Sequence, residues 1–218
     1  MTHINQQFDT AMSTMPLVAI LRGVMPAEVV SIGQALWQCG FTVIEVPLNS
    51  PQPYASIALL KEALGANTIV GAGTVLSAQQ VREVKQAGGD LCVSPNTNTQ
   101  VIEQALQLDM ISMPGYQSLT EAYTAIEAGA RYLKSFPVSV LGVAGVTAHR
   151  AVIPSDVSLI GVGGIDPINV QAYAGAGCNG FGLAGSLFQP GDKAIQVADT
   201  AAKMVTAVKH SCLPCATQ

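Results

Sequence analysis

Short apolar runs alternate along the chain with longer segments whose apolar residues recur at helical spacing. Eight such runs start 19 to 27 residues apart, at 17–23, 41–48, 68–75, 91–95, 110–115, 131–137, 158–164 and 180–185. Near-continuous apolar strands separated by helices are typical of a parallel sheet that is covered on both faces. The intervening segments have helical signals: residues 77–89, for example, begin with a serine cap and end in paired glycines.

Eight strand–helix units within 218 residues predict a closed (β/α)8 barrel, the α/β fold known as the TIM barrel. An open, doubly wound sheet is the alternative, but the G-x-G-x-x-G usual after its first strand is replaced here by RGVMPAE. The polar stretch at 4–15 predicts a short N-terminal helix that closes the bottom of the barrel. Because no linker-like segment divides the chain, we expect one domain, 1–218, with the barrel at 17–209 and a C-terminal tail at 210–218.

Composition and charge narrow the class of protein. Hydrophobic residues make up 49% of the chain and charged residues 11%, which indicates a large core rather than disorder. The net charge of -4 gives no support for nucleic-acid or anionic-membrane partners. The first 15 residues are polar and the first apolar run stops at Arg22, which fits neither a signal peptide nor a membrane span, so we expect a cytoplasmic protein.

The five cysteines agree with a cytoplasmic location. Cys39, Cys92 and Cys178 lie in or beside apolar elements and are expected to be small core residues. Cys212 and Cys215 form a C-x-x-C in the tail, where the strand–helix context of a redox pair is lacking. We therefore expect no redox function for the tail pair.

Two charged residues lie inside predicted strands, and they carry the functional argument. Lys134 lies in RYLKSFP and Glu45 in VIEVPL, whereas the other lysines fall in helical stretches. Arg22 and Thr74 also lie in the second halves of their strands, and active sites of these barrels form at the carboxyl ends of strands. Strand alternation permits all four side chains to point inward. A structural Glu45–Lys134 ion pair is the alternative, although such pairs rarely stabilise a core more than apolar packing does.

A lysine inside an apolar barrel is suited to imine chemistry. Burial disfavours the ammonium and lowers the pKa of the lysine, and a neutral amine attacks a ketone carbonyl to form a Schiff base. The protonated imine withdraws electrons, so that a neighbouring carbon–carbon bond can break and leave an enamine. Glu45 is the buried acid that could move the protons, directly or through a water. The sequence therefore predicts Lys134 as nucleophile and Glu45 as acid and base.

Glycine-rich segments end the last two predicted strands, GVGGI at 161–165 and GLAGS at 182–186. Loops at these positions of a TIM barrel often bind phosphate through backbone N–H groups, and Ser186 could add a hydroxyl donor. Tight strand-to-helix packing is an equally good reason for the glycines. His3, His149 and His210 lie far apart in the sequence, so no metal site is predicted, and imine chemistry needs no cofactor.

The motifs together resemble a known family. In order along residues 17–188, AILRG, IEVPLNSP, VGAGTV, SPN, PG, LKSFP, VGGI and GLAGS resemble the bacterial 2-keto-3-deoxy-6-phosphosugar-acid aldolases, class I enzymes on a (β/α)8 barrel that usually assemble as homotrimers. The resemblance implies that Lys134 is the Schiff-base lysine and that Glu45 donates and accepts protons. It also implies substrate contacts at Arg22 and Thr74, the latter near the pyruvate carboxylate. The residues that match the phosphate end are Gly163, Gly164 and Ser186.

Two further positions distinguish branches of this family. Asn49 stands where gluconate-type enzymes typically carry an arginine, and Val162 stands where they tend to carry a threonine before the paired glycines. Both departures resemble the galactonate branch, whose substrate differs in configuration at C4. The resemblance thus implies reversible cleavage of a phosphorylated 2-keto-3-deoxy sugar acid into pyruvate and glyceraldehyde 3-phosphate. Two alternatives stay open: an aldolase for the gluconate epimer or 4-hydroxy-2-oxoglutarate, and a non-catalytic barrel that binds phosphorylated ligands.

Overall fold

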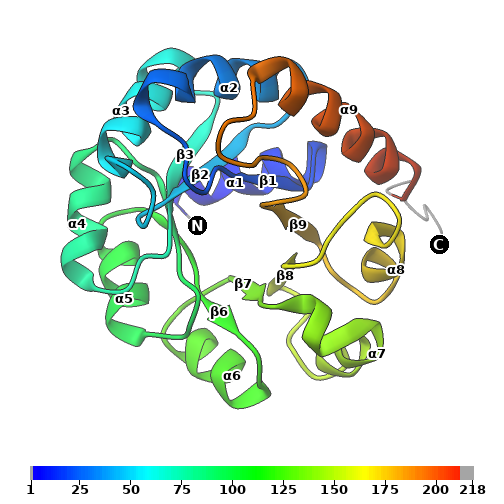
Figure 1. Cartoon of the computed structure of the whole chain (residues 1–218). Coiled ribbons are helices and arrows are strands. Elements are labelled where there is room, and N and C mark those ends of the chain that lie inside the picture. Colours follow the sequence, from blue (N-terminus) through cyan, green and yellow to red (C-terminus); the bar gives the residue numbers. More distant parts are fainter. Residues whose placement is uncertain (1, 212–218) are drawn as a thin grey trace.

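The structure, a computed structural model, describes residues 2–211 and consists of parallel strands in a nearly closed barrel, surrounded by helices (Figure 1). The strands are β1 (Leu17–Ile20), β2 (Val43–Pro47), β3 (Ile69–Gly73), β4 (Leu91–Val93), β5 (Ile111–Met113), β6 (Gly115–Tyr116), β7 (Tyr132–Ser135), β8 (Ser158–Val162) and β9 (Gly180–Leu183). Their spatial order, β5-β4-β3-β2-β1-β9-β8-β7-β6, confirms the predicted α/β barrel. Cys212 and Cys215 lie outside the described residues.

The fifth predicted strand is divided in the structure by Pro114. The part before this proline, β5, pairs with β4, and the part after it, β6, pairs with β7. Proline has no N–H to donate to a strand ladder, so pairing stops at this residue. The Pro114 carbonyl still accepts the Lys134 backbone N–H at 2.8 Å. The eight expected strands therefore appear as nine.

Helices cover the outside of the barrel and bury most of the apolar core against it. After the N-terminal helix come α2 (Pro26–Gln38), α3 (Pro53–Leu64), α4 (Ala78–Gln86), α5 (Thr99–Gln107), α6 (Leu119–Glu127), α7 (Val138–Arg150), α8 (Val170–Gly175) and α9 (Ala194–Ser211). The predicted cap of α4 is present, since the Ser77 hydroxyl accepts the Gln80 backbone N–H at 3.2 Å. Cys92 and Cys178 are buried and Cys39 is half-buried, and these three are free thiols.

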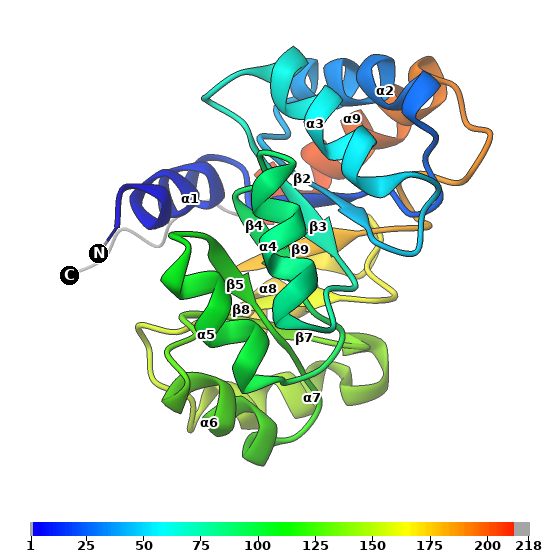
Figure 2. The same cartoon turned by 90° about the vertical axis from the view of Figure 1, so that its left-hand side faces the viewer.

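The predicted bottom helix is α1 (His3–Thr14), which lies across one end of the barrel (Figure 2). Phe8 and Met12 of this helix belong to the apolar cluster that fills the barrel interior. The Phe8 ring packs edge-on against Tyr132 of β7, with ring centroids 4.5 Å apart. The Tyr132 hydroxyl donates to the Asp9 carboxylate at 2.7 Å. These contacts close the amino-terminal end of the barrel, so the open end is the carboxyl end of the strands.

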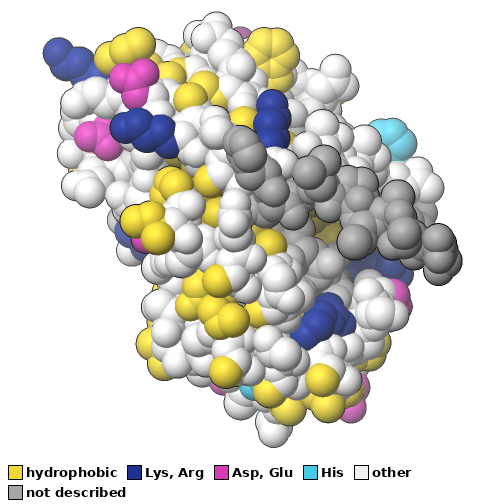
Figure 3. Space-filling view, turned by 90° about the vertical axis from the view of Figure 1, so that its right-hand side faces the viewer, with side chains coloured by type: hydrophobic (Ala, Val, Ile, Leu, Met, Phe, Trp, Pro, Cys, Tyr) yellow, Lys and Arg dark blue, Asp and Glu magenta, His cyan; other side chains and the backbone are white. Residues whose placement is uncertain are grey.

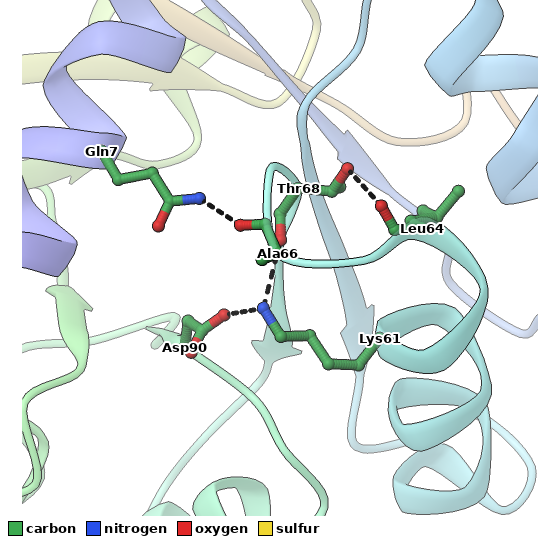
Figure 4. Close-up of polar contacts among 6 residues, drawn as sticks. All are labelled: Gln7, Lys61, Leu64, Ala66, Thr68 and Asp90. Atoms are coloured by element: carbon green, nitrogen blue, oxygen red, sulfur yellow. Dashed lines mark hydrogen bonds and ion pairs between the residues drawn. The ribbon is translucent and has the colours of Figure 1, made fainter.

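Polar contacts tie α1 to the loop before β3 (Figure 4). The Gln7 side-chain amide donates to the Ala66 carbonyl at 2.6 Å. In the same region the Lys61 ammonium pairs with Asp90 and donates to the Thr68 carbonyl. The charged and polar groups at this end thus hold loops together rather than facing the barrel interior.

Alternation along the strands decides which side chains face the barrel interior. Val43 of β2 and Tyr132 of β7 belong to the interior cluster. Glu45 and Lys134 follow them by two residues on the same strands, so they point to the same side, one layer nearer the open end. The barrel therefore places both ionisable side chains in its interior, above an apolar floor.

One face of the exterior has mixed polarity. On the face shown in Figure 3, basic, acidic and apolar side chains are interspersed over the part that is not drawn in grey. Within residues 2–211, no helix has both the length and the apolar character needed to cross a membrane.

Candidate active site

Lys134 is almost completely buried inside the barrel. Its side chain is 5% exposed, and its amine lies 4.4 Å from the centroid of the Phe136 ring. Burial lowers the pKa of Lys134, the Glu45 carboxylate opposes this change, and the Arg22 cation reinforces it. The net effect shifts the equilibrium toward the neutral amine, which is the nucleophilic form.

Glu45 lies inside the barrel on β2 and is 1% exposed. Burial raises its pKa to about 7, although the positive charges of Lys134 and Arg22 and the Gly73 backbone N–H favour the carboxylate. Among residues 2–211 the one ion pair is Lys61–Asp90, so Glu45 and Lys134 influence each other without direct pairing. This arrangement does not support a structural ion pair in the core. A carboxyl group that titrates near neutrality can both give and take protons.

Gly73, at the end of β3, makes room for the Glu45 carboxylate. A Cβ atom at this glycine would lie 2.2 Å from Oε2 and 2.4 Å from Oε1 of Glu45. The Oε2 atom is buried and has no hydrogen-bond partner within the part of the chain that the structure describes. The carboxylate thus packs against the backbone of Gly73, and its Oε2 atom can act on a bound molecule or a water.

Arg22 does not end β1 as the sequence predicted but lies in the loop after it. The strand stops at Ile20, and the chain turns at Gly23, which has a φ of 84°. The Arg22 side chain is exposed at the open end of the barrel and donates from Nη1 to Oδ1 of Asn49 at 2.7 Å. The charge therefore lies at the entrance, close enough to act on both buried ionisable groups.

Thr74 follows β3 directly and has a left-handed backbone, with a φ of 57°. This conformation is strained for a β-branched residue and is worth a functional explanation. It turns the chain sharply at the open end of the barrel, immediately after the glycine that faces Glu45. Thr74 is thus held at the position where the sequence predicted a substrate contact.

The glycine-rich loops lie side by side because β8 and β9 are neighbours in the sheet. Gly163 and Gly164 have φ values of 92° and 86°, which glycine adopts at little cost. A Cβ atom at Gly164 would also lie 2.8 Å from the side chain of Ser139. Ser186 is exposed in the turn after β9. The loops therefore combine tight packing with exposed backbone at the open end.

Val162 ends β8 and points into the barrel, with 4% of its surface exposed. A Cβ atom at Gly182 of β9 would lie 2.7 Å from a Val162 methyl group, so this valine fills the space above the glycine. The apolar side chain offers no hydrogen bond to a bound molecule. Val162 therefore presents an apolar surface inside the barrel, directly before the paired glycines Gly163 and Gly164.

A cavity of about 550 Å³ lies at the opposite end of the barrel, lined by α1 and by residues such as Thr42 and Asn67. It contains amide, hydroxyl and apolar groups and one histidine, His3, but none of the buried ionisable residues. The two buried ionisable residues, Lys134 and Glu45, thus lie away from this cavity. Within the described part of the chain, no three His, Cys, Asp or Glu side chains form a group that could hold a metal ion.

The structure brings the predicted catalytic candidates together and adds three residues that the sequence did not reveal. Gly73 accommodates the carboxylate, Phe136 lies against the Lys134 amine, and the Ser50 hydroxyl accepts the Gly23 backbone N–H at 2.9 Å. The sequence did contain a signal for Gly73. Glycines occupy two alternate positions, Gly71 and Gly73, of the strand that follows the strand of Glu45. Ser50 had no signal, since its role depends on how two loops meet.

Comparisons with known proteins agree with this geometry. The sequence model of the family described as KDPG and KHG aldolase matches residues 8–206. The chain is 48% identical over 176 residues to a probable 2-dehydro-3-deoxy-6-phosphogalactonate aldolase of Rhizobium meliloti (strain 1021), covering 81% of this chain and 83% of that one. It is 41% identical over 197 residues to the 2-dehydro-3-deoxy-6-phosphogalactonate aldolase of Escherichia coli (strain K12), covering 90% and 96%.

The fold gives the same result. The solved structure described as native KDPGal superposes with a TM-score of 0.89 at 41% identity, over 90% of this chain and 96% of that chain. A match to nearly the whole barrel, with relatives above 40% identity, is not a likeness of fold alone. The chain is therefore a carbon–carbon lyase that belongs to the KDPG and KHG aldolase family.

Proposed function

We propose that this aldolase reversibly cleaves 2-dehydro-3-deoxy-6-phospho-D-galactonate into pyruvate and D-glyceraldehyde 3-phosphate through a Schiff base on Lys134. The observation that carries the proposal is the buried Lys134 amine in the same interior as Glu45. Its pKa is lowered, and it has no ion-pair partner among residues 2–211. The choice of the galactonate substrate rests on the names of the relatives at 41% and 48% identity and on Asn49 and Val162.

The first half of the reaction forms the imine. The neutral Lys134 amine attacks C2 of the substrate, and the resulting carbinolamine loses water as Glu45 supplies a proton. The pKa of Glu45, about 7, lets this group carry a proton in one step and accept one in the next. The apolar floor of the barrel keeps the amine dry, which sustains its nucleophilicity.

The second half breaks the carbon–carbon bond. Glu45 takes the proton of the C4 hydroxyl, the C3–C4 electron pair moves toward the protonated imine, and glyceraldehyde 3-phosphate leaves. Glu45 then returns a proton to C3 of the enamine, and hydrolysis of the imine releases pyruvate and restores the free amine. The Oε2 atom of Glu45 supports this role, because none of the described residues forms a hydrogen bond with it.

The substrate carries a carboxylate at one end and a phosphate at the other, and the open end of the barrel has groups for both. We assign Thr74 to the carboxylate end and Gly163, Gly164 and Ser186 to the phosphate end. The exposed backbone of two neighbouring loops suits phosphate oxygens. Val162 faces the middle of the substrate, where the two epimers differ.

The test is a comparison of kcat/KM for the pure galactonate and gluconate epimers and for 4-hydroxy-2-oxoglutarate. A clear preference for the galactonate epimer supports the proposal. A preference for the gluconate epimer or for 4-hydroxy-2-oxoglutarate would contradict the choice of substrate and indicate an aldolase with the same Schiff-base chemistry but another substrate. Binding of a phosphorylated ligand without turnover of any of the three would indicate a non-catalytic barrel.

Assembly and location complete the proposal. We expect a homotrimer in the cytoplasm, as is usual for the family that the motifs resemble. Light scattering coupled to size-exclusion chromatography measures the assembly, and a mass of one or two chains would contradict the trimer. Fractionation of cells that express the protein tests its location.

A further inference from the structure

Two loops at the open end of the barrel are joined by a pair of adjacent hydrogen bonds. Asn49 accepts from the Arg22 guanidinium at 2.7 Å, and Ser50 accepts from the Gly23 backbone N–H at 2.9 Å. Two consecutive residues after β2 thus hold two consecutive residues after β1. One bond fixes a side chain and the other fixes the backbone that carries it.

The Ser50 end of this junction is rigid. Ser50 is 7% exposed, and its own N–H donates to the Pro47 carbonyl at 2.8 Å, which closes a tight turn. Gly23 has a left-handed φ of 84° and lies against Pro190, whose Cγ would be 2.8 Å from a Cβ atom at this position. Arg22 is therefore anchored at its backbone, and its exposed side chain is held by the hydrogen bond to Asn49.

The chemical nature of the Asn49 acceptor matters as much as its position. An amide oxygen orients a guanidinium without cancelling its charge, whereas a carboxylate in the same place would neutralise it. The charged groups that act on Lys134 are Glu45 of β2 and Arg22 after β1, and these act in opposite directions. The pKa of Glu45 is in turn lowered by two cations, Lys134 and Arg22. The full charge of Arg22, held in place, therefore offsets the effect of Glu45 on the lysine.

We propose that Asn49 and Ser50 are positioning residues that hold Arg22 over the barrel entrance, and that this placement sets how readily Lys134 forms an imine near neutral pH. The proposal rests on the proposed Schiff-base function. It gives Asn49 a role through Arg22 rather than through the substrate.

The test follows imine formation with pyruvate across pH, trapped by borohydride and quantified as intact mass. Without Asn49 the guanidinium swings into solvent, the Lys134 ammonium becomes more favourable, and the rise of trapping with pH moves to higher pH. Interactions between exposed charges are small, so Asn49→Ala should move the midpoint by about half a pH unit and slow trapping at pH 7 about threefold. Ser50→Ala should move it in the same direction. Asn67→Ala, an exposed asparagine at the other end of the barrel, is the control.

A double-mutant cycle separates positioning from other roles. Arg22→Ala alone should shift the midpoint at least as far as Asn49→Ala, and Asn49→Ala should add nothing to it. A purely structural defect would reduce trapping at every pH without moving the midpoint, and that result would overturn the proposal. A further shift of the midpoint when Asn49→Ala is added to the Arg22→Ala variant would also overturn the proposal. Absence of any adduct in the unmodified enzyme would instead refute the Schiff-base function itself.

Discussion

The burial of Glu45 leads to a stability prediction that runs against the usual effect of losing a native side chain. The folded protein holds this carboxyl group at a pKa of about 7, compared with an ordinary value of 4.5. Because the folded-state value is the higher one, the folded chain binds the proton more tightly than the unfolded chain. Stability is therefore lost as the pH rises from about 4.5 to about 7. Glu45→Gln removes the ionisation and should remove this loss.

The magnitude follows from the two pKa values. Compared with a group whose pKa does not change on folding, Glu45 lowers the free energy of unfolding by about 1 kcal/mol at pH 5 and by about 3 kcal/mol at pH 8. The gain from Glu45→Gln should therefore be about 2 kcal/mol larger at pH 8 than at pH 5.

The assay is urea or thermal unfolding of Glu45→Gln and the unmodified protein at both pH values. For a chain of this size the difference corresponds to about 4 to 8 °C in Tm between the two conditions. Glu62→Gln, which changes an exposed carboxyl on α3, serves as the matched control and should show little effect at either pH. A gain that is equal at pH 5 and pH 8, or a loss at pH 8, would refute the argument that Glu45 is destabilised by burial.

Three other substitutions test the remaining parts of the account. Gly73→Ala should displace the Glu45 carboxylate and lower kcat about 100-fold, whereas Gly175→Ala on α8, where a Cβ atom meets nothing within 4 Å, should leave kcat unchanged. Val162→Thr should move the kcat/KM ratio toward the gluconate epimer, by about 10-fold if the new hydroxyl gains one hydrogen bond; an unchanged ratio would remove Val162 from the specificity argument. Phe8→Ala should destabilise the barrel by about 3 to 5 kcal/mol in urea unfolding, yet retain trapping of pyruvate in the folded protein.

The periodic apolar runs were sufficient to predict the barrel, because each strand is buried on both faces and each helix on one. They also predicted that Lys134 and Glu45 share the interior, since an isolated charge within a strand has few other reasons to be there. The division of the fifth strand at Pro114 was missed, although the proline itself was visible in the sequence. Its effect depends on which neighbours need its missing N–H, and pairing is a property of the assembled sheet.

Contacts between loops could not be predicted from the sequence. Arg22 was expected at the end of a strand, but a turn at Gly23 places it in a loop, where it meets Asn49. The substrate contact expected for Asn49 stays a prediction, and the hydrogen bond that its side chain accepts from Arg22 was not foreseen. The space that Gly73 leaves for Glu45 depends on the register of two strands that are distant in sequence, which apolar spacing does not encode.

The most direct test of the central claim is to treat the enzyme with pyruvate and borohydride and to map the modified peptide. We expect one stable adduct, on Lys134, and no adduct in a folded Lys134→Met variant. An adduct on another lysine, or none in the folded unmodified protein, would contradict the assignment of Lys134 as the Schiff-base residue.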